Sequence, residues 1–362
     1  MRLWLFVCDR RNQTHSSLCI RTGKSGMKLI FPSSVVGALF LFIACMPSIY
    51  PPGHAVRLPQ LTETDFLTKD DIRLPVRRWM PESGEPGAII IAVHGFNDYS
   101  NFFSDTGRYL STLGIASYAF DQRGFGASPS PGYWSGTPAY TNDLEEFTRQ
   151  IKGRHPNIPV YLLGESMGGA VVIVAMQSGS MPDVDGVILS APAVWGWELM
   201  PWYQQLLLWV TAHSVPWMTV TGEGVGVKPS DNIEMLRALG RDPLVIKETR
   251  VEAVYGLVNL MDNAMRKSSG INGRTLFLYG EKDEIIPRVP IYKALSSLPV
   301  NDDSGLVKVA IYENGYHMLL RDLQADIPWK DIVSWIQSPG KPLPSGADER
   351  GLSTLAKVND NS

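Results

Sequence analysis

Residues 160–168 of this chain, VYLLGESMG, decide its predicted fold. Residues 160–163 form a short apolar run typical of a buried strand, and residues 167–177 have the spacing of a helix. A Gly-x-Ser-x-Gly sequence between a strand and a helix is the pattern of a nucleophile elbow, a turn that exposes a serine hydroxyl. We therefore predict that Ser166 is a nucleophile, and that Gly164 and Gly168 leave the space that this turn requires.

Other apolar runs place this turn within a larger sheet. The residues from 140 to 154 have helical spacing, and further strands are expected at 88–93, 116–120, 186–189, 275–279 and 307–312. The run at 88–93, AIIIAV, is continuous, as expected of a strand that is buried on both faces. Strands that alternate with helices predict an α/β protein with a mostly parallel central sheet and helices on both faces.

One long stretch interrupts this alternation. No convincing strand is found from about 192 to 268, and five tryptophans gather near its start. We interpret the stretch as an inserted helical cap, in which Trp195, Trp197 and Trp202 line a substrate site. The alternative is that these rings pack the cap's own core. The globular domain then covers residues 61–338, after a Pro-rich linker at 46–60 and before a polar tail at 339–362 that we expect to be disordered.

The first 45 residues have the features of a targeting or anchoring segment. Residues 35–44 are almost wholly apolar and follow a basic segment, but they are too few to span a bilayer comfortably. This pattern favours a secretory signal. Met27 is a natural start, which would make residues 1–26 an over-extended beginning.

The apolar run ends in the sequence FIAC, residues 42–45, which resembles the lipobox of bacterial lipoproteins. In that interpretation Cys45 carries the lipid, although Phe42 stands where Leu is usual. An uncleaved membrane anchor is the alternative. Both predict a domain outside the cytoplasm, in the cell envelope and associated with a membrane.

Composition excludes several classes of protein. The chain has 362 residues, of which 44% are hydrophobic and 19% charged, as expected of one large globular domain. Its net charge of −3 gives no reason to expect a nucleic-acid partner. All three cysteines precede residue 46, which excludes disulfides and thiolate chemistry in the domain. No metal and no cofactor are expected, because no cluster has ligand spacing; the oligomeric state stays open.

A serine needs a base to remove its proton and an acid to orient that base. His317 follows the last predicted strand and is the candidate base, because the other histidines are worse placed. Asp283 follows the strand before it and is the candidate acid, with Glu281 and Glu284 as competitors. The order Ser, Asp, His along the chain agrees with this assignment.

An oxyanion site needs two backbone N–H donors. Met167 follows the nucleophile and supplies one. Phe96, in the loop after the strand at 88–93, is the predicted second donor. His94 in the same loop is interpreted as structural, and residues 121–128 as a structural turn, because they lack the ending of a phosphate-binding loop.

These motifs together resemble a known family. HGF at 94–96, D-x-RGFGAS at 121–128, GESMGG at 164–169 and YH at 316–317 are similar to the monoacylglycerol lipase and lysophospholipase group of α/β-hydrolases. The resemblance extends from about residue 66 to 337. It implies an α/β-hydrolase fold and a Ser166–His317–Asp283 triad. Glu165 departs from the pattern, because many members have His there.

The resemblance implies hydrolysis of a single-chain lipid ester, a monoacylglycerol or lysophospholipid, through an acyl-enzyme. A short-chain carboxylesterase or small amidase with the same triad is the first alternative. A fold that has lost catalysis and only binds a ligand is the second. Labelling by a serine-reactive fluorophosphonate separates the second from the others, and chain-length preference separates the first from lipid hydrolysis.

Overall fold

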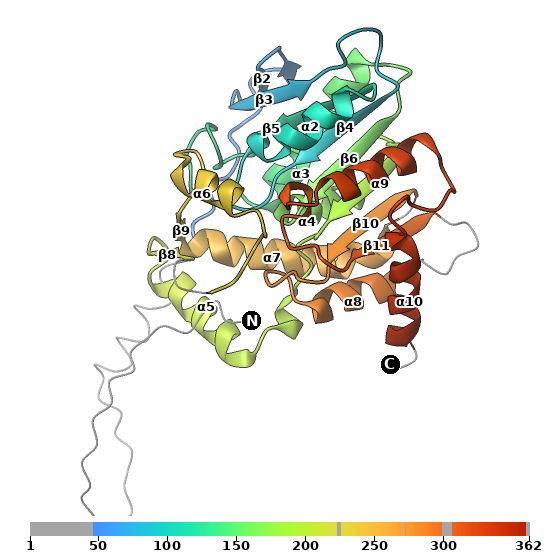
Figure 1. Ribbon diagram of the computed structural model, residues 1–362. Coiled ribbons are helices and arrows are strands. Elements are labelled where there is room, and N and C mark those ends of the chain that lie inside the picture. The colour runs from blue at the N-terminus through green and yellow to red at the C-terminus, as the bar shows by residue number, and fades with distance from the viewer. Residues whose placement is uncertain (1–45, 223–225, 272, 299–305, 360–362) are drawn as a thin grey trace, which may run out of the picture.

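A nine-stranded sheet organises the computed structural model, which describes residues 46–222, 226–271, 273–298 and 306–359 (Figure 1). The strand order is β1-β2-β3-β5-β4-β6-β7-β10-β11. The six strands from β5 to β11 in this order run parallel to their neighbours. Their bounds are β4 (Ala88–Val93), β5 (Ile115–Phe120), β6 (Val160–Glu165), β7 (Gly186–Ser190), β10 (Thr275–Gly280) and β11 (Val307–Tyr312). The predicted strands, and the mostly parallel sheet, are confirmed.

Apolar residues on both faces of β4 explain why this sheet lies in the middle of the molecule. Ile89 and Ile91 belong to one hydrophobic cluster and Ile90 to another, and all three are fully buried. A strand without a polar face must be covered on both sides. Helices supply that cover, so the predicted architecture of helices on both faces is also confirmed (Figure 1).

Two groups of helices form these outer layers. On one face, α2 (Ser104–Ser111) and α9 (Asp326–Gln337) contribute Leu110 and Ile332 to the cluster of Ile90. The other face is covered by α3 (Thr137–Arg154), α4 (Met167–Met176), α7 (Val251–Lys267) and α8 (Arg288–Ser297), whose apolar side chains join the cluster of Ile89.

Three antiparallel strands that the sequence did not predict extend the sheet at its N-terminal edge. They are β1 (Gln60–Leu61), β2 (Asp65–Leu67) and β3 (Arg73–Trp79), and β3 pairs with β5. Two of these strands are too short to show an alternating pattern in the sequence. In β3, Pro75 and three arginines interrupt the apolar pattern expected of a strand. The residues before β1, expected as a linker, lie against the domain: Tyr50 N–H donates to the Trp134 carbonyl and Val56 N–H to that of Lys69, each at 2.8 Å.

The segment expected as a cap contains α5 (Trp202–Ser214), α6 (Ile233–Arg241) and α7, with a short 3₁₀ turn at Trp197–Leu199. The expectation that it has no strand is wrong. β8 (Thr219–Thr221) and β9 (Glu248–Arg250) pair antiparallel within it. Each has only three residues, so no alternating pattern could develop in the sequence.

The C-terminal tail also differs from its prediction. Residues 347–359, expected to be disordered, form α10 (Ala347–Asn359), which packs on β11. Ala347 and Leu355 are buried, and Gly351 lies so close to the strand that a Cβ there would be 2.1 Å from the Val309 carbonyl oxygen. Small or apolar residues at intervals of four make this contact, and the charges between them conceal the pattern.

Within the four ranges that the structure describes, no helix combines the length and the apolar character needed to cross a bilayer. The predicted signal or anchor at residues 1–45, with Cys45, lies outside these ranges.

Candidate active site

The turn between β6 and α4 holds Ser166 in an unusual backbone conformation. Its φ is 54° and its ψ −117°, in a region that residues with a side chain seldom adopt. The turn is held by a hydrogen bond of 3.0 Å from Ser166 N–H to the Ser190 carbonyl of β7. Ser166 is half-buried and directly precedes α4, whose first nine residues are buried. A serine in this conformation at a strand-to-helix turn has the geometry of a nucleophile elbow.

The two flanking glycines are required by close backbone contacts. A Cβ on Gly164 would lie 2.5 Å from the Gly168 carbonyl oxygen, and one on Gly168 would lie 2.1 Å from that of Val93. Atoms of a side chain cannot approach backbone this closely. The elbow is therefore packed directly against the end of β4, from which the loop of Phe96 continues.

Asp283 and His317 come together at the same edge of the sheet. The His317 Nδ1 lies 2.8 Å from Asp283 Oδ2, and both side chains are buried. The other carboxylate oxygen, Oδ1, accepts hydrogen bonds from the N–H groups of Ile285 and Ile286 at 2.8 and 3.0 Å. Asp283 is thus fixed as an acceptor for the imidazole. Of the competing acids, Glu284 is exposed and accepts a hydrogen bond from Lys228 N–H instead.

Two opposing effects set the protonation of His317. Burial disfavours the charged ring, but the negative charge and the hydrogen bond of Asp283 outweigh it, and the pKa of His317 is raised above its ordinary value of 6.5. A base with a raised pKa holds a proton taken from serine more firmly. The structure has no hydrogen bond between these two described residues, Ser166 and His317, although catalytic contacts often tighten only when substrate binds.

The predicted oxyanion donors flank the elbow. Met167 is the first residue of α4, where an N–H has no acceptor within the helix. Phe96 lies in the loop after β4, next to Gly95, where a Cβ would be 3.4 Å from that of Ser166. The loop N–H groups and the elbow are therefore neighbours.

His94 is held beneath this loop as a neutral ring. Gln122 N–H donates to its Nε2 at 3.0 Å, so the proton is on Nδ1, which lies 2.8 Å from the Gly95 carbonyl oxygen. Burial lowers the pKa of His94. Its geometry is that of a structural residue. His155 contacts Tyr118, and His213 stacks on Trp209.

A buried arginine, which sequence reasoning missed, lies between these loops. The Arg321 guanidinium donates to Asp98 Oδ2 at 2.7 Å and to Glu165 Oε1 at 2.6 Å. The only sequence signal is Glu165 itself, a carboxylate at the buried end of a strand, which requires a positive partner.

Besides the contact of Lys228 with Glu284, the cap segment is bonded to two more of the site's loops. On the oxyanion side, the Asn97 amide donates to Thr249 Oγ1 at 2.6 Å. On the histidine side, Ser230 Oγ donates to Asp322 Oδ1 at 2.6 Å, and Met318 N–H to the Pro229 carbonyl at 2.9 Å. Burial raises the pKa of Asp322 to about 6. The cap thus contacts the site through residues near both of its functional loops.

The three tryptophans predicted to line the substrate site have different surroundings. Trp195 is half-buried against the core, and Trp197 packs on Tyr255 and donates from Nε1 to Asn259 Oδ1 at 2.9 Å. Trp202 is 74% exposed at the start of α5. Trp195 therefore packs on both the main core and the cap, Trp197 packs within the cap, and Trp202 faces outward.

No group of three or more His, Cys, Asp or Glu side chains within the described ranges is arranged to hold a metal ion. Of the predicted catalytic side chains, the structure brings Asp283 and His317 into direct contact.

Comparisons with known proteins identify the family of this chain. A family model described as serine aminopeptidase, S33, matches residues 84–324. The monoacylglycerol lipase of Mycolicibacterium smegmatis is 24% identical over 76% of this chain and 97% of its own length, and the monoglyceride lipase of Rattus norvegicus 26% over 77% and 91%.

Among solved structures, a soluble variant of monoglyceride lipase from Saccharomyces cerevisiae superposes with a TM-score of 0.65 at 19% identity. The match covers 80% of this chain and 98% of that one, and it supports the fold. The predicted resemblance is confirmed: the chain belongs to the serine aminopeptidase S33 family of α/β-hydrolases, and it is similar to monoacylglycerol lipases.

Proposed function

We propose that this chain hydrolyses esters of single-chain lipids, monoacylglycerols or lysophospholipids, with Ser166, His317 and Asp283 as its catalytic triad. The chain is a carboxylic ester hydrolase of its family, and the proposal concerns its substrate and its residues. The observation that carries it is the Asp283–His317 hydrogen bond of 2.8 Å, at the sheet edge where Ser166 has its positive φ.

In the first half of the reaction, His317 takes the proton of the Ser166 hydroxyl as Oγ forms a bond to the ester carbonyl carbon. The carbonyl oxygen becomes an oxyanion, which the N–H groups of Phe96 and Met167 stabilise. The carbon–oxygen bond to the alcohol then breaks, and His317 gives its proton to the departing alkoxide. Water attacks the acyl-enzyme by the same steps and releases the fatty acid and free Ser166.

The half-buried Phe96 ring, which packs on the buried rings of Phe125 and Trp134, supports an acyl chain as the bound group. The Phe96 ring lies 5.7 Å from that of Phe125 and 6.4 Å from that of Trp134. Each methylene buried against such rings contributes about 0.8 kcal/mol. The two relatives named above carry names that specify monoacylglycerols, and they match over nearly their whole length.

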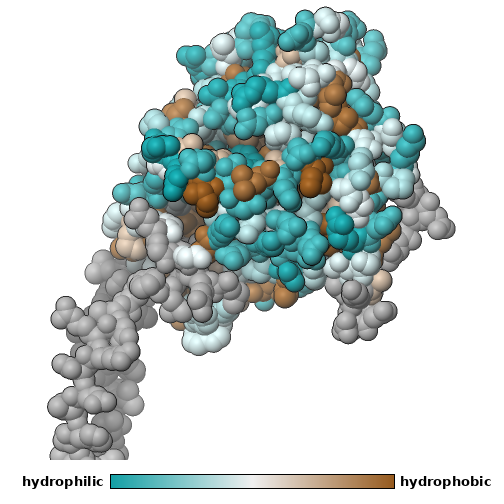
Figure 2. Space-filling model, in the orientation of Figure 1, coloured by the Kyte–Doolittle hydropathy of each residue, from teal (hydrophilic) through white to brown (hydrophobic). Residues whose placement is uncertain are grey.

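The outer face of α5 supports association with a membrane. Trp202, Leu206, Trp209 and Val210 are exposed at the spacing of one helical face, and α5 contains no Lys, Arg, Asp or Glu. The face shown in Figure 2 is mostly hydrophilic, with hydrophobic groups scattered over it. An apolar helix rich in tryptophan is typical of a helix lying in the interface of a bilayer.

The first described residues of the chain lie next to this cap. Ser48 N–H donates to Glu252 Oε2 of α7 at 3.3 Å, so the described chain begins beside the cap. We include in the proposal that residues 1–45, with Cys45 as the lipidated residue or as part of an anchor, hold the enzyme at the cell envelope with α5 facing the lipid.

Fatty-acid release from a monoacylglycerol, a lysophospholipid and a short-chain ester tests the reaction, with the Ser166→Ala variant as reference. Activity on the long-chain lipids that disappears in the variant supports the proposal. Activity on the short ester alone would overturn the substrate class, and activity that survives in the variant would overturn the nucleophile. Failure to label with a fluorophosphonate would indicate a binding protein.

Flotation with anionic and neutral vesicles tests the membrane contact in full-length protein carrying Cys45→Ser. Leu206→Ser is expected to lower vesicle binding, with unchanged hydrolysis of a soluble ester. Leu113→Ser, at an exposed leucine outside the cap, is the matched control. Equal binding by all three proteins would exclude α5 as the contact.

An amidase is the second candidate, because the matching family model is described as a serine aminopeptidase. The same triad cleaves amides when a site protonates the leaving amine. Aminoacyl p-nitroanilides tested beside the esters distinguish the two.

A further inference from the structure

Arg321 connects the three loops that carry the candidate catalytic groups. Asp98 follows Phe96 by two residues in the oxyanion loop, Glu165 directly precedes Ser166, and Arg321 follows His317 by four residues. The guanidinium bridges the two carboxylates at 2.7 and 2.6 Å, and all three side chains are buried. These three loops follow different strands. Arg321, from the histidine loop, bonds to the oxyanion loop through Asp98 and to the elbow through Glu165.

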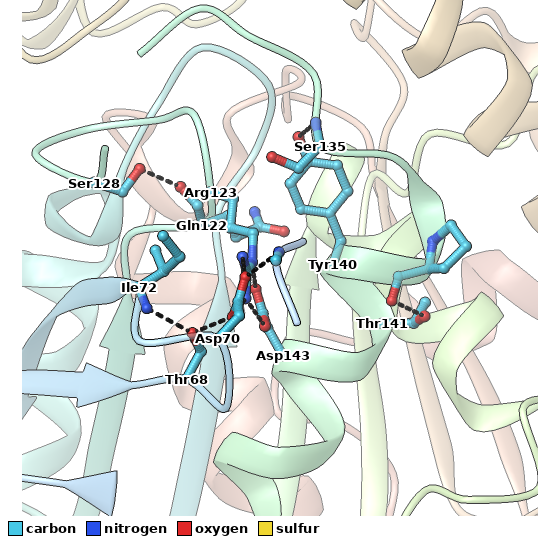
Figure 3. A network of polar contacts seen from close by, with 12 residues as sticks. Thr68, Asp70, Ile72, Gln122, Arg123, Ser128, Ser135, Tyr140, Thr141 and Asp143 are labelled. Atoms are coloured by element: carbon cyan, nitrogen blue, oxygen red, sulfur yellow. Dashed lines mark hydrogen bonds and ion pairs between the residues drawn. The ribbon is translucent and has the colours of Figure 1, made fainter. Parts of the chain in front are cut away.

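A second buried arginine shows what a structural bridge looks like in this chain. Arg123 is also buried between two carboxylates, Asp70 and Asp143 (Figure 3). The Arg123 guanidinium donates four hydrogen bonds: Nε and Nη2 donate to Asp143, and Nη1 and Nη2 donate to Asp70. Its partners lie before β3 and in α3, and they hold the edge of the sheet together.

The Arg321 bridge is less complete. Within the described part of the chain, Arg321 Nε and Glu165 Oε2 are buried and have no hydrogen-bond partner. Buried charges whose polar atoms are only partly satisfied are a poor way to stabilise a fold, and an apolar set of similar volume does so as well or better. A contribution to stability therefore does not explain this bridge as it does that of Arg123.

We propose that Arg321 is a positioning residue for the hydrolytic reaction, which fixes the oxyanion loop, the elbow and the histidine loop relative to one another through Asp98 and Glu165. This inference rests on the proposed function of these three loops. Glu165 then has a specific purpose: directly before the nucleophile, it provides a carboxylate that Arg321 can hold.

The bridge also lies within electrostatic range of the base. The charged groups that act on the His317 ring are Asp283 from the β10 loop, Glu165 from the elbow and Arg321 from its own loop. Asp283 and Glu165 raise the pKa of His317, and Arg321 lowers it. Replacing Glu165 with Gln should therefore lower that pKa and move the acid limb of kcat/KM to lower pH.

The test uses three full-length variants, Arg321→Lys, Asp98→Asn and Glu165→Gln, on a soluble p-nitrophenyl ester. Lys cannot bridge two carboxylates as a guanidinium does, so Arg321→Lys is expected to lower kcat by up to about 100-fold, the cost of a misplacement near 1 Å. KM should change less than kcat. Glu165→Gln should shift the acid limb of the pH profile downward, which a purely structural role would not do.

Arg123→Lys and Asp143→Asn are the matched controls, since they alter the other buried arginine bridge. They are expected to lower the unfolding midpoint but to leave kcat and the pH profile unchanged. If Arg321→Lys fails to fold, Asp98→Asn still carries the test, because it changes only one end of the bridge.

The proposal is overturned if the Arg321, Asp98 and Glu165 variants behave as their controls do, with lower stability but native kcat and acid limb. Failure of the proposed function is a different result. In that case the wild-type protein itself has no ester hydrolysis that depends on Ser166, or hydrolyses only esters other than those of single-chain lipids.

Discussion

Substituting Gly168 with Ala should disable the elbow without touching a reacting group. The added Cβ would lie 2.1 Å from the Val93 carbonyl oxygen and 2.8 Å from that of His94. Ordinary contacts of this kind begin at 3.4 Å, so α4 and the end of β4 must separate by about 1.3 Å. All the opposing atoms are backbone, and no side-chain rotation can relieve the contact.

This separation moves the Met167 N–H away from the oxyanion loop. A misplacement near 1 Å costs about 100-fold in rate, and overpacking costs about 1–3 kcal/mol of stability. We expect kcat on a p-nitrophenyl ester to fall about 100-fold, together with the rate of fluorophosphonate labelling. The free energy of unfolding, from urea titration, should fall by about 1–3 kcal/mol.

Gly153→Ala is the control, because nothing lies within 4 Å of a Cβ at that exposed position of α3. There the same substitution should stabilise the protein by about 0.5–1 kcal/mol and leave kcat unchanged. A Gly168→Ala enzyme with native kcat and native stability would refute the packing argument, since it would mean that the elbow and β4 can move apart freely.

Three further predictions concern the base, the acid and the C-terminal helix. Asp283→Asn should lower kcat about 10⁴-fold, because its amide would favour the wrong tautomer of His317; steady-state kinetics showing a loss below tenfold would exclude Asp283 as the acid. Because the pKa of His317 is raised, kcat/KM should fall as pH drops through a midpoint above 6.5, and a measured midpoint below 6.5 would contradict this. Truncation after Gly346 removes the buried Ala347 and Leu355 of α10 and should cost about 2–4 kcal/mol in urea unfolding; an unchanged midpoint would show that α10 does not stabilise β11.

The parallel strands were predictable because the burial of each one is evident from its own residues. Each of β4, β5, β6, β7 and β10 is buried along its whole length, so an unbroken apolar run suffices to locate it. The candidate triad was predictable for a related reason. Its members follow β6, β10 and β11, and parallel strands bring their carboxyl ends to one edge of the sheet.

The features that escaped prediction depend on contacts between distant residues. Arg321 lies 223 residues from Asp98 and 156 from Glu165, and nothing in the local sequence pairs them. The short strands β8 and β9 exist only because each pairs with the other. For α10, the signal was present as Ala347, Gly351 and Leu355, but the polar composition around it favoured disorder.

The contacts of the cap divide it into two parts. One part bonds to the loops of the site, and the other does not and can vary in sequence more freely. The residues that bond to the loops of the site lie between Lys228 and Thr249. The stretch before them, which contains α5, packs on α7, and Gln205 of α5 bonds to the Trp197 and Met200 carbonyls. Exchange of this stretch between relatives would therefore replace the outer surface of the enzyme while the anchoring residues keep their partners. In a chimaera, the residues from Trp197 to Thr221 would be replaced by those of a relative. Such an exchange would transfer the outer surface of the cap but none of the candidate catalytic residues.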